Sequence, residues 1–205
     1  MYGFIYPISN WFLLNLNKLN LVELFKWVAN LFNKNKSDDI KIAAYKHYGT
    51  DVFIILKWIL LFVLWKYKIT GSFTTFFVWY LIVANLYTYF YHHIWKDTAL
   101  KTDDFLIARI KRRFQNLMLA LAYSVCSFGY LIQVPYSSDF NWGGKPIIFS
   151  HALSFSFSNS LAANYVVVQP LTEDGNLICN LELLITFVFV TLIVSRSIPQ
   201  TNSNK

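Results

Sequence analysis

Two ionisable side chains stand inside long apolar stretches of this sequence, where a charge needs a partner or a function. Glu182 lies in the stretch at residues 177–195, and Lys57 lies in the stretch at residues 52–67. An ionisable residue in such a place is a functional candidate by default. The alternative for Glu182 is a structural role, in which it is hydrogen-bonded to a Ser or Asn of a neighbouring helix. For Lys57, a side chain that extends towards the membrane surface is the simpler interpretation.

Residues that could bind a metal or act as nucleophiles are few and poorly spaced. His92 and His93 are adjacent, but no further metal ligand is near them in the sequence. Cys126 and Cys179 fit no metal or redox motif, and apolar packing explains them better. His151 has no Ser or Cys at the spacing of a catalytic triad, and no phosphate-binding glycine loop occurs. The sequence therefore predicts no enzyme, no metal site and no cofactor.

The composition indicates that these residues are placed in a membrane protein. Hydrophobic residues make up 56% of the 205 residues and charged residues only 14%, whereas a soluble domain has about 25% charged residues. A soluble particle with so few charges could not cover its surface. Disorder is excluded by the aromatic content of 19%, and a disulfide scaffold by the presence of only two cysteines.

Four segments are apolar enough to cross a bilayer, which takes about 20 mostly apolar residues. They are residues 52–67, 73–91, 117–134 and 177–195. Helices buried in a soluble core are the alternative, which we reject because four such segments in one short chain leave no polar surface. The predicted fold class is therefore an all-α membrane protein with four transmembrane helices.

Lys and Arg are concentrated in regions that share one side of a four-span topology. They precede the first span, fill the loop between the second and third spans, and follow the fourth. The positive-inside rule then places both termini in the cytosol and residues 135–176 outside a bacterial inner membrane. The basic loop is interpreted as a determinant of topology, as a site for anionic lipid, or as a docking site for a soluble partner. Its candidate residues are Arg109, Lys111, Arg112 and Arg113.

The N-terminal fifty residues are predicted to form a separate region. Apolar residues from Leu21 to Phe32 follow helical spacing, and polar residues fall largely on the other face. This pattern is typical of an amphipathic helix that lies in the inner membrane interface. A fifth, poorly hydrophobic span is the rival interpretation, although several Asn and Lys residues interrupt it.

The loop before the last span is too long and too apolar for an ordinary surface loop. Residues 151–168 read HALSFSFSNSLAANYVVV, after a turn-like FNWGGKP at residues 140–146. Such a segment either re-enters the membrane or packs as an outer cap, and a re-entrant backbone is tolerated only where protein or water surrounds it. The order of span, loop, short apolar helix, extended stretch, proline and span is typical of a pore loop.

Residues 111–196 resemble the two-transmembrane, one-pore-loop module of potassium channels, and most of all its small bacterial four-span members. The sequence Phe155-Ser156-Phe157 is similar to the FSF near the end of that family's pore helix. Tyr165 falls at the tyrosine of the filter, and Arg196 at a common arginine of the last helix. The resemblance implies a re-entrant pore helix supported by Phe155, Phe157, Pro170 and Glu182. It also implies four copies around one axis, because a single pore loop would expose unsatisfied backbone to lipid.

The filter stretch departs from the family pattern TTLGYGD. Asn164 and Val166 stand where the two glycines permit the alternating backbone that presents carbonyl oxygens to potassium. A β-branched Val is poorly suited to positive φ, and the threonine hydroxyls are missing as well. We therefore expect no strong preference for potassium over sodium. The degenerate filter comprises Ser160, Ala162, Ala163, Asn164, Tyr165, Val166 and Val167.

The predicted function is that of a homotetrameric inner-membrane sensor or scaffold with a degenerate channel-like pore, working with a soluble cytosolic partner. A conducting, weakly selective channel is the alternative. The architecture also resembles, more loosely, the membrane subunit of Kiwa-type antiviral systems, which implies a role in phage defence. The expected partners are the lipid bilayer, other copies of the chain and a soluble protein, but not nucleic acid. The predicted organisation is an N-terminal region (1–50), two spans (51–92), a basic loop (93–113), a channel-like module (114–196) and a tail (197–205).

Overall fold

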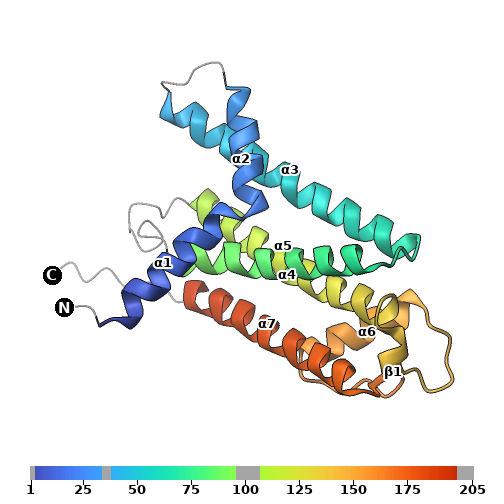
Figure 1. Cartoon of the computed structure of the whole chain (residues 1–205). Coiled ribbons are helices and arrows are strands. Elements are labelled where there is room, and N and C mark those ends of the chain that lie inside the picture. The colour runs from blue at the N-terminus through green and yellow to red at the C-terminus, as the bar shows by residue number, and fades with distance from the viewer. Residues whose placement is uncertain (1–2, 34–37, 96–106, 198–205) are drawn as a thin grey trace. The chain divides into compact units, whose positions relative to one another are not determined.

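The computed structural model describes residues 3–33, 38–95 and 107–197, and these are almost entirely helical (Figure 1). The chain divides into two compact units, Met1–Val63 and Leu64–Lys205, which are described separately below. In chain order the elements are α1 (Ile5–Lys18), α2 (Leu21–Leu31), α3 (Asp39–Lys66), α4 (Ser72–Phe90), the π-helix η1 (Tyr91–Trp95), α5 (Ile107–Gln133), the 3-10 helix η4 (Ser137–Asp139), β1 (Phe140–Asn141), α6 (Phe149–Ser160), β2 (Gln169–Pro170) and α7 (Glu173–Ser197).

Four helices within the described ranges are long and apolar enough to cross a membrane. Their candidate spans are Lys41–Lys66, Ser72–Phe90, Lys111–Gln133 and Glu173–Val194. The prediction of an all-helical chain with four membrane-length helices is therefore confirmed. The first helix begins well before the predicted residue 52, because the Asp38 carboxylate accepts a hydrogen bond from the Lys41 backbone N–H at 3.2 Å and so caps its first turn.

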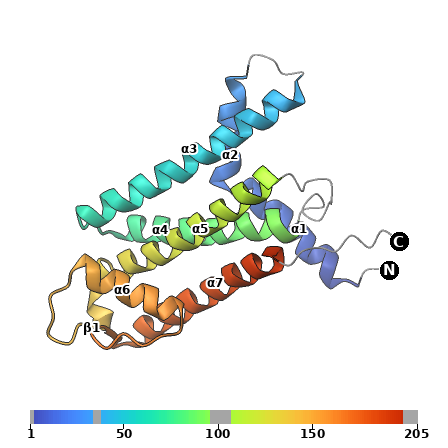
Figure 2. The same cartoon turned by 180° about the vertical axis from the view of Figure 1, so that it is seen from behind.

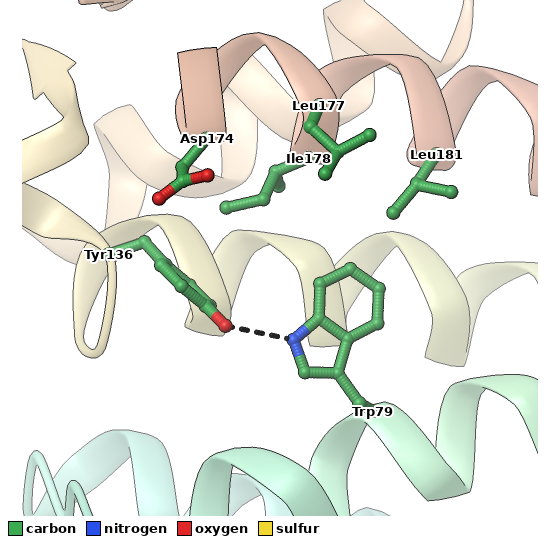
Figure 3. Close-up of a pocket in the computed structure, with 6 residues that line it drawn as sticks. All are labelled: Trp79, Tyr136, Asp174, Leu177, Ile178 and Leu181. Atoms are coloured by element: carbon green, nitrogen blue, oxygen red, sulfur yellow. Dashed lines mark hydrogen bonds between the residues drawn. The ribbon is translucent and has the colours of Figure 1, made fainter. Parts of the chain in front are cut away.

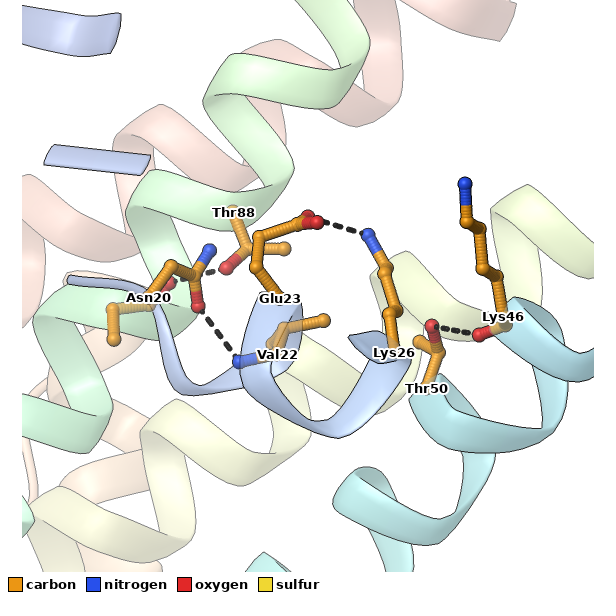
Figure 4. Close-up of polar contacts among 8 residues, drawn as sticks. Asn20, Val22, Glu23, Lys26, Lys46, Thr50 and Thr88 are labelled. Carbon is orange, nitrogen blue, oxygen red and sulfur yellow. Dashed lines mark hydrogen bonds and ion pairs between the residues drawn. The ribbon is translucent and has the colours of Figure 1, made fainter. Parts of the chain in front are cut away.

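The start of α2 is set by local polar contacts (Figure 4). The Asn20 side chain accepts a hydrogen bond from the Val22 backbone N–H at 3.1 Å, which is the usual role of an N-cap residue. Glu23, in the first turn, suits the positive end of the helix dipole and pairs with Lys26 at 2.7 Å. The amphipathic helix predicted from Leu21 to Phe32 is thus present as α2, and its place in the membrane interface stays a prediction.

Within the first unit, α2 approaches α3 very closely at a glycine. A Cβ on Gly49 would lie 2.7 Å from the Phe25 carbonyl oxygen and 3.0 Å from the Ala29 Cβ, so a side chain there would push the helices apart. The Phe25 and Phe53 rings meet beside this point with centroids 5.3 Å apart. In contrast, α1 buries no residue, and Trp11 is 68% exposed. At 14 and 11 residues, α1 and α2 are each shorter than a span.

The second unit is built around α5, which contacts α4, α6 and α7 (Figures 1 and 2). Of the apolar stretch of α5, 61% is buried, compared with 22% in α4 and 39% in α7. Polar side chains also join the helices: the Asn85 amide of α4 donates to the Ala120 carbonyl of α5 at 2.9 Å. Interhelical hydrogen bonds of this kind favour close helix pairs in a membrane.

A short strand pair closes the loop between α5 and α7 at its base. β1 and β2 are antiparallel, with Phe140 opposite Pro170. Beside them, the Asp139 carboxylate accepts a hydrogen bond from the Thr172 hydroxyl at 2.9 Å, and the Thr172 hydroxyl in turn accepts from the Gly175 N–H at 3.1 Å. A Cβ on Gly175 would lie 2.5 Å from the Asp139 carbonyl oxygen. The start of α7 is therefore fixed directly against the end of η4.

Candidate functional site

The helix α6 lies in the loop between two membrane-length helices and packs against both α5 and α7 (Figure 2). Its 12 residues correspond to a length of about 18 Å, which is too short to cross a bilayer. Ala152, Phe155 and Ser156 are buried, and their spacing of three and four residues puts them on one face of the helix. The predicted supporting residue Phe155 lies in this face, and its ring meets Phe140 edge-on at 5.7 Å.

Glu182 connects α6 to α7 through buried hydrogen bonds. Its side chain has no exposed area, and one oxygen accepts a hydrogen bond from the Ser156 hydroxyl. The other oxygen accepts from the Asn159 amide at 2.8 Å, and the same amide donates to the Cys179 carbonyl at 3.1 Å. The Ser156 hydroxyl also lies 2.7 Å from the Val125 carbonyl oxygen of α5. The Ser and Asn partners that the structural interpretation of Glu182 predicts are thus present.

The segment after α6 begins with an Ala in an unusual backbone conformation. Ala162 has φ of 54°, in the left-handed region that glycine normally occupies. The Ala163 N–H donates to the Ser158 carbonyl and the Ala162 N–H to the Asn159 carbonyl, both at 2.8 Å. These two bonds form the Schellman motif that ends many helices. The first residues of the predicted filter therefore serve to terminate α6.

Tyr165, the predicted filter tyrosine, is held by a side chain that the sequence did not connect with it. The Tyr165 hydroxyl lies 2.9 Å from Nδ1 of His151, in the first turn of α6. This bond ties the middle of the segment back to the start of the helix. Neither residue belongs to a recognisable motif with the other, and because α6 ends at Ser160, between them, no helical or strand period relates the two. The only signal was that both residues are polar within an apolar loop.

Apolar side chains are exposed along the rest of the segment. Leu161 is 62% exposed, Val166 is 75% exposed, and Phe157 of α6 is 57% exposed. Asn164 is exposed beside them, while Val167 is half-buried. The Ser160 hydroxyl donates to the Phe157 carbonyl at 2.7 Å, so it is already engaged. The structure thus places the predicted filter residues on one continuous stretch whose surface is largely apolar.

The basic residues before the third span occupy the first turns of α5. Lys111 and Arg113 are exposed and Arg112 is half-buried. The side chains of Arg109 and Arg196 lie outside those that the structure describes, as do residues 96–106 of the predicted basic loop. The described part of this surface therefore presents two exposed cationic side chains.

Lys57 has a contact that the sequence interpretation did not include. It is only 5% exposed, and its ammonium lies 5.9 Å from the centroid of the Phe53 ring, one turn nearer the start of α3. An ammonium over an aromatic face is attracted by the ring's electrons, which helps to offset its burial.

Metal ligands do not gather anywhere in residues 3–33, 38–95 and 107–197: no group of three or more His, Cys, Asp or Glu could hold an ion. Both cysteines are free, and Cys179 is buried on α7. No family model, no curated protein and no solved structure matches this chain. The likeness to potassium channels therefore rests on the motif residues alone.

Proposed function

We propose that the protein is a homotetrameric membrane sensor or scaffold with a degenerate potassium-channel-like pore. In this arrangement α6 and residues 161–168 of each copy re-enter the membrane and surround a shared axis. The observation that carries the proposal is the placement of a 12-residue helix and a non-helical return between two membrane-length helices, with Glu182 holding the short helix against α7.

The exposed surface of residues 161–168, called here the return segment, supports assembly into a tetramer. Leu161 and Val166 present apolar side chains, and the backbone around them is neither helix nor strand. Backbone of this kind is not stable facing lipid, because its polar groups would lack partners there. Four copies around an axis would give the segment protein and water as neighbours in place of lipid.

The residues of the segment argue against potassium selectivity. A selective filter needs closely spaced backbone carbonyls at every level. Here Ala162 takes the left-handed conformation to end a helix, and the Tyr165 side chain is bonded to His151. With Asn164 and Val166 in place of glycines, the segment is suited to sensing or scaffolding more than to conduction of potassium.

In this proposal a soluble cytosolic partner protein carries out the response to whatever the membrane protein senses. The exposed Lys111 and Arg113 at the start of α5 offer a basic surface for it, on the side of the membrane that the positive-inside rule makes cytosolic. Under the same rule both termini lie in the cytosol, and the resemblance to small bacterial channels places the protein in a bacterial inner membrane. The looser likeness to Kiwa-type membrane subunits extends the proposal to phage defence.

A weakly selective conducting channel is the second candidate. The small side chains of Ala162 and Ala163 and the exposed amide of Asn164 favour it. Four copies of small and polar side chains around an axis would leave room for hydrated ions, without the carbonyl cage that distinguishes them.

Mass and conductance measurements test both candidates. Light scattering or native mass spectrometry of the full chain in nanodiscs is expected to give four times the 24.0 kDa chain mass. A stable monomer would contradict the tetramer. In planar bilayers with opposed potassium and sodium gradients, we expect no resting current for the sensor and a reversal potential near zero for the weak channel. A reversal potential that follows the potassium gradient would refute both.

The variant Asn164→Gly/Val166→Gly is expected to remain unselective, because the inner threonine hydroxyls are still missing.

A further inference from the structure

A cavity of about 320 Å³ opens between α4 and α7, beside the end of α5. It belongs wholly to the second unit and lies away from the return segment. Figure 3 shows the side chains that line it, with the Asp174 carboxylate at one end, Leu181 and Trp79 at the other, and the Tyr136 hydroxyl between them. The lining residues are Trp79, Tyr136, Asp174, Leu177, Ile178 and Leu181.

The cavity changes from polar to apolar along α7. Asp174 is in the first turn of that helix, and Leu181, seven residues further on, lies about 10 Å deeper along the helix axis. Leu177 and Ile178 lie between them. If α7 spans the membrane, the carboxylate lies at headgroup depth and the leucines face the hydrocarbon. This gradient matches a molecule with a polar head and an apolar chain.

The polar end favours a cation. Within the described part of the chain, no hydrogen bond or ion pair engages the Asp174 carboxylate. Tyr136 lies beside it and reaches towards Trp79, which faces Leu181 at the other end of the cavity (Figure 3); the Trp79 indole N–H donates to the Tyr136 hydroxyl at 3.2 Å. Phe128 meets the Trp79 ring edge-on at 5.5 Å, so the indole is held from behind as well. A carboxylate next to a fixed aromatic ring is suited to an organic ammonium.

We propose that this cavity binds the ammonium group of an amphiphile. The ammonium lies between the Asp174 carboxylate and the ring of Tyr136, and Trp79 faces the hydrocarbon chain. The hydrocarbon chain follows Leu177 and Leu181 along α7. This proposal does not depend on the pore, because none of the lining residues belongs to α6 or to residues 161–168.

The bilayer and the aqueous phase are both possible sources of such a group: an ethanolamine lipid or a soluble alkylamine. A neighbouring cavity of about 610 Å³ shares Trp79 and Tyr136 and carries the hydroxyls of Thr70, Ser72 and Thr75. Hydroxyl donors suit the phosphate oxygens of a lipid headgroup. An ethanolamine lipid would thus have partners for both of its charges in these two cavities, which share Trp79 and Tyr136.

The experiment compares lipids and amines on the full-length protein. The protein is placed in nanodiscs of phosphatidylglycerol with or without phosphatidylethanolamine, and the lipids retained after release are measured by native mass spectrometry. Hexylammonium is titrated calorimetrically into the phosphatidylglycerol nanodiscs. We expect selective retention of phosphatidylethanolamine, and saturable hexylammonium binding that competes with it. Hexylammonium binding without lipid retention would assign the site to a soluble amine.

Two neighbouring acidic residues provide a matched control. Asp174→Asn is expected to weaken retention and hexylammonium binding about tenfold. Glu173→Gln removes a charge from the same helix turn but lies outside the cavity, so binding should be unchanged. Leu181→Trp fills the apolar end and should abolish binding with Asp174 intact, which keeps the test valid if Asp174→Asn fails to fold. Equal effects of Asp174→Asn and Glu173→Gln, or equal retention of both lipids, would overturn the proposal.

Discussion

The helix α6 and the segment that follows it are adjacent in the chain but differ in how they are held. The buried face of α6 has its polar groups engaged: Ser156 and Asn159 both contact Glu182, and each also reaches a backbone carbonyl. Residues 161–168 expose Leu161 and Val166 and start with an Ala in a conformation that favours glycine. A single chain therefore supplies the hydrogen-bond partners of the buried face of α6, whereas it supplies few contacts to residues 161–168.

This difference separates what holds the fold from what is available for function. Breaking the contacts of α6 should lower the stability of the whole second unit. Changes in the return segment should alter its local order while leaving the unit folded. The three predictions below test this division, beginning with the largest expected effect.

Replacing Glu182 with Ala should destabilise the second unit most. The substitution removes two hydrogen bonds and leaves a buried hole, which together cost about 2–4 kcal/mol in the free energy of unfolding. Equilibrium unfolding in mixed detergent micelles with sodium dodecyl sulfate measures this cost.

The variant Glu182→Gln is the matched control. Its amide oxygen can still accept from Asn159, and its NH₂ can donate to the Ser156 oxygen while the Ser156 hydroxyl donates to Val125. We expect a loss below about 1 kcal/mol. A loss as large as that of the Ala variant would mean that the charge of Glu182, and not its hydrogen bonds, is what α6 requires.

Replacing Tyr165 with Phe should loosen the return segment without unfolding the unit. The lost hydrogen bond to His151 is worth about 1 kcal/mol, and its effect is confined to residues between the two partners. Hydrogen exchange should become faster in residues 161–168 and stay unchanged in α7. His151→Gln, which can still bond the Tyr165 hydroxyl, should exchange more slowly than His151→Ala. Unchanged exchange in Tyr165→Phe would show that the hydroxyl does not order the segment.

Replacing Ala162 with Gly should give a small stabilisation. Glycine adopts a φ of 54° without the penalty that Ala incurs, which is about 1 kcal/mol. Ala163→Gly is the control, because Ala163 is not one of the described residues with positive φ. There the glycine only adds freedom to the unfolded chain, which should cost about 0.5 kcal/mol. The free energy of unfolding of both variants is measured by the same equilibrium unfolding in mixed detergent micelles. If both variants shifted stability in the same direction, the left-handed conformation at Ala162 would not be the cause.

The sequence was sufficient to predict the features that depend on composition along a single helix. Each of the four apolar stretches became a membrane-length helix, because about 20 apolar residues in a row have no better structure in lipid. The partner type of Glu182 was also predictable, since a buried carboxylate needs donors and the loop between the spans is rich in Ser and Asn.

Contacts between distant residues of unlike type could not be predicted. The close approach of α2 to the α3 backbone depends on the missing side chain at Gly49, which lies beside Phe25 and Ala29. The bond between His151 and Tyr165 follows no period, and the left-handed Ala162 contradicts the usual preference for glycine. Each of these depends on geometry that only the folded chain supplies.

The strand pair at the base of the loop has a consequence for how this protein can vary. Phe140 opposite Pro170, together with the bond from Thr172 to Asp139, holds the two ends of the excursion at one fixed separation. Insertions or deletions in residues 142–147 or 161–168, which leave α6 and its bonds to Glu182 in place, would therefore leave the spacing of α5 and α7 unchanged. These two segments are exchangeable parts on a constant frame to which α6 itself belongs, so chimaeras that keep α6 could carry foreign segments into the same membrane scaffold.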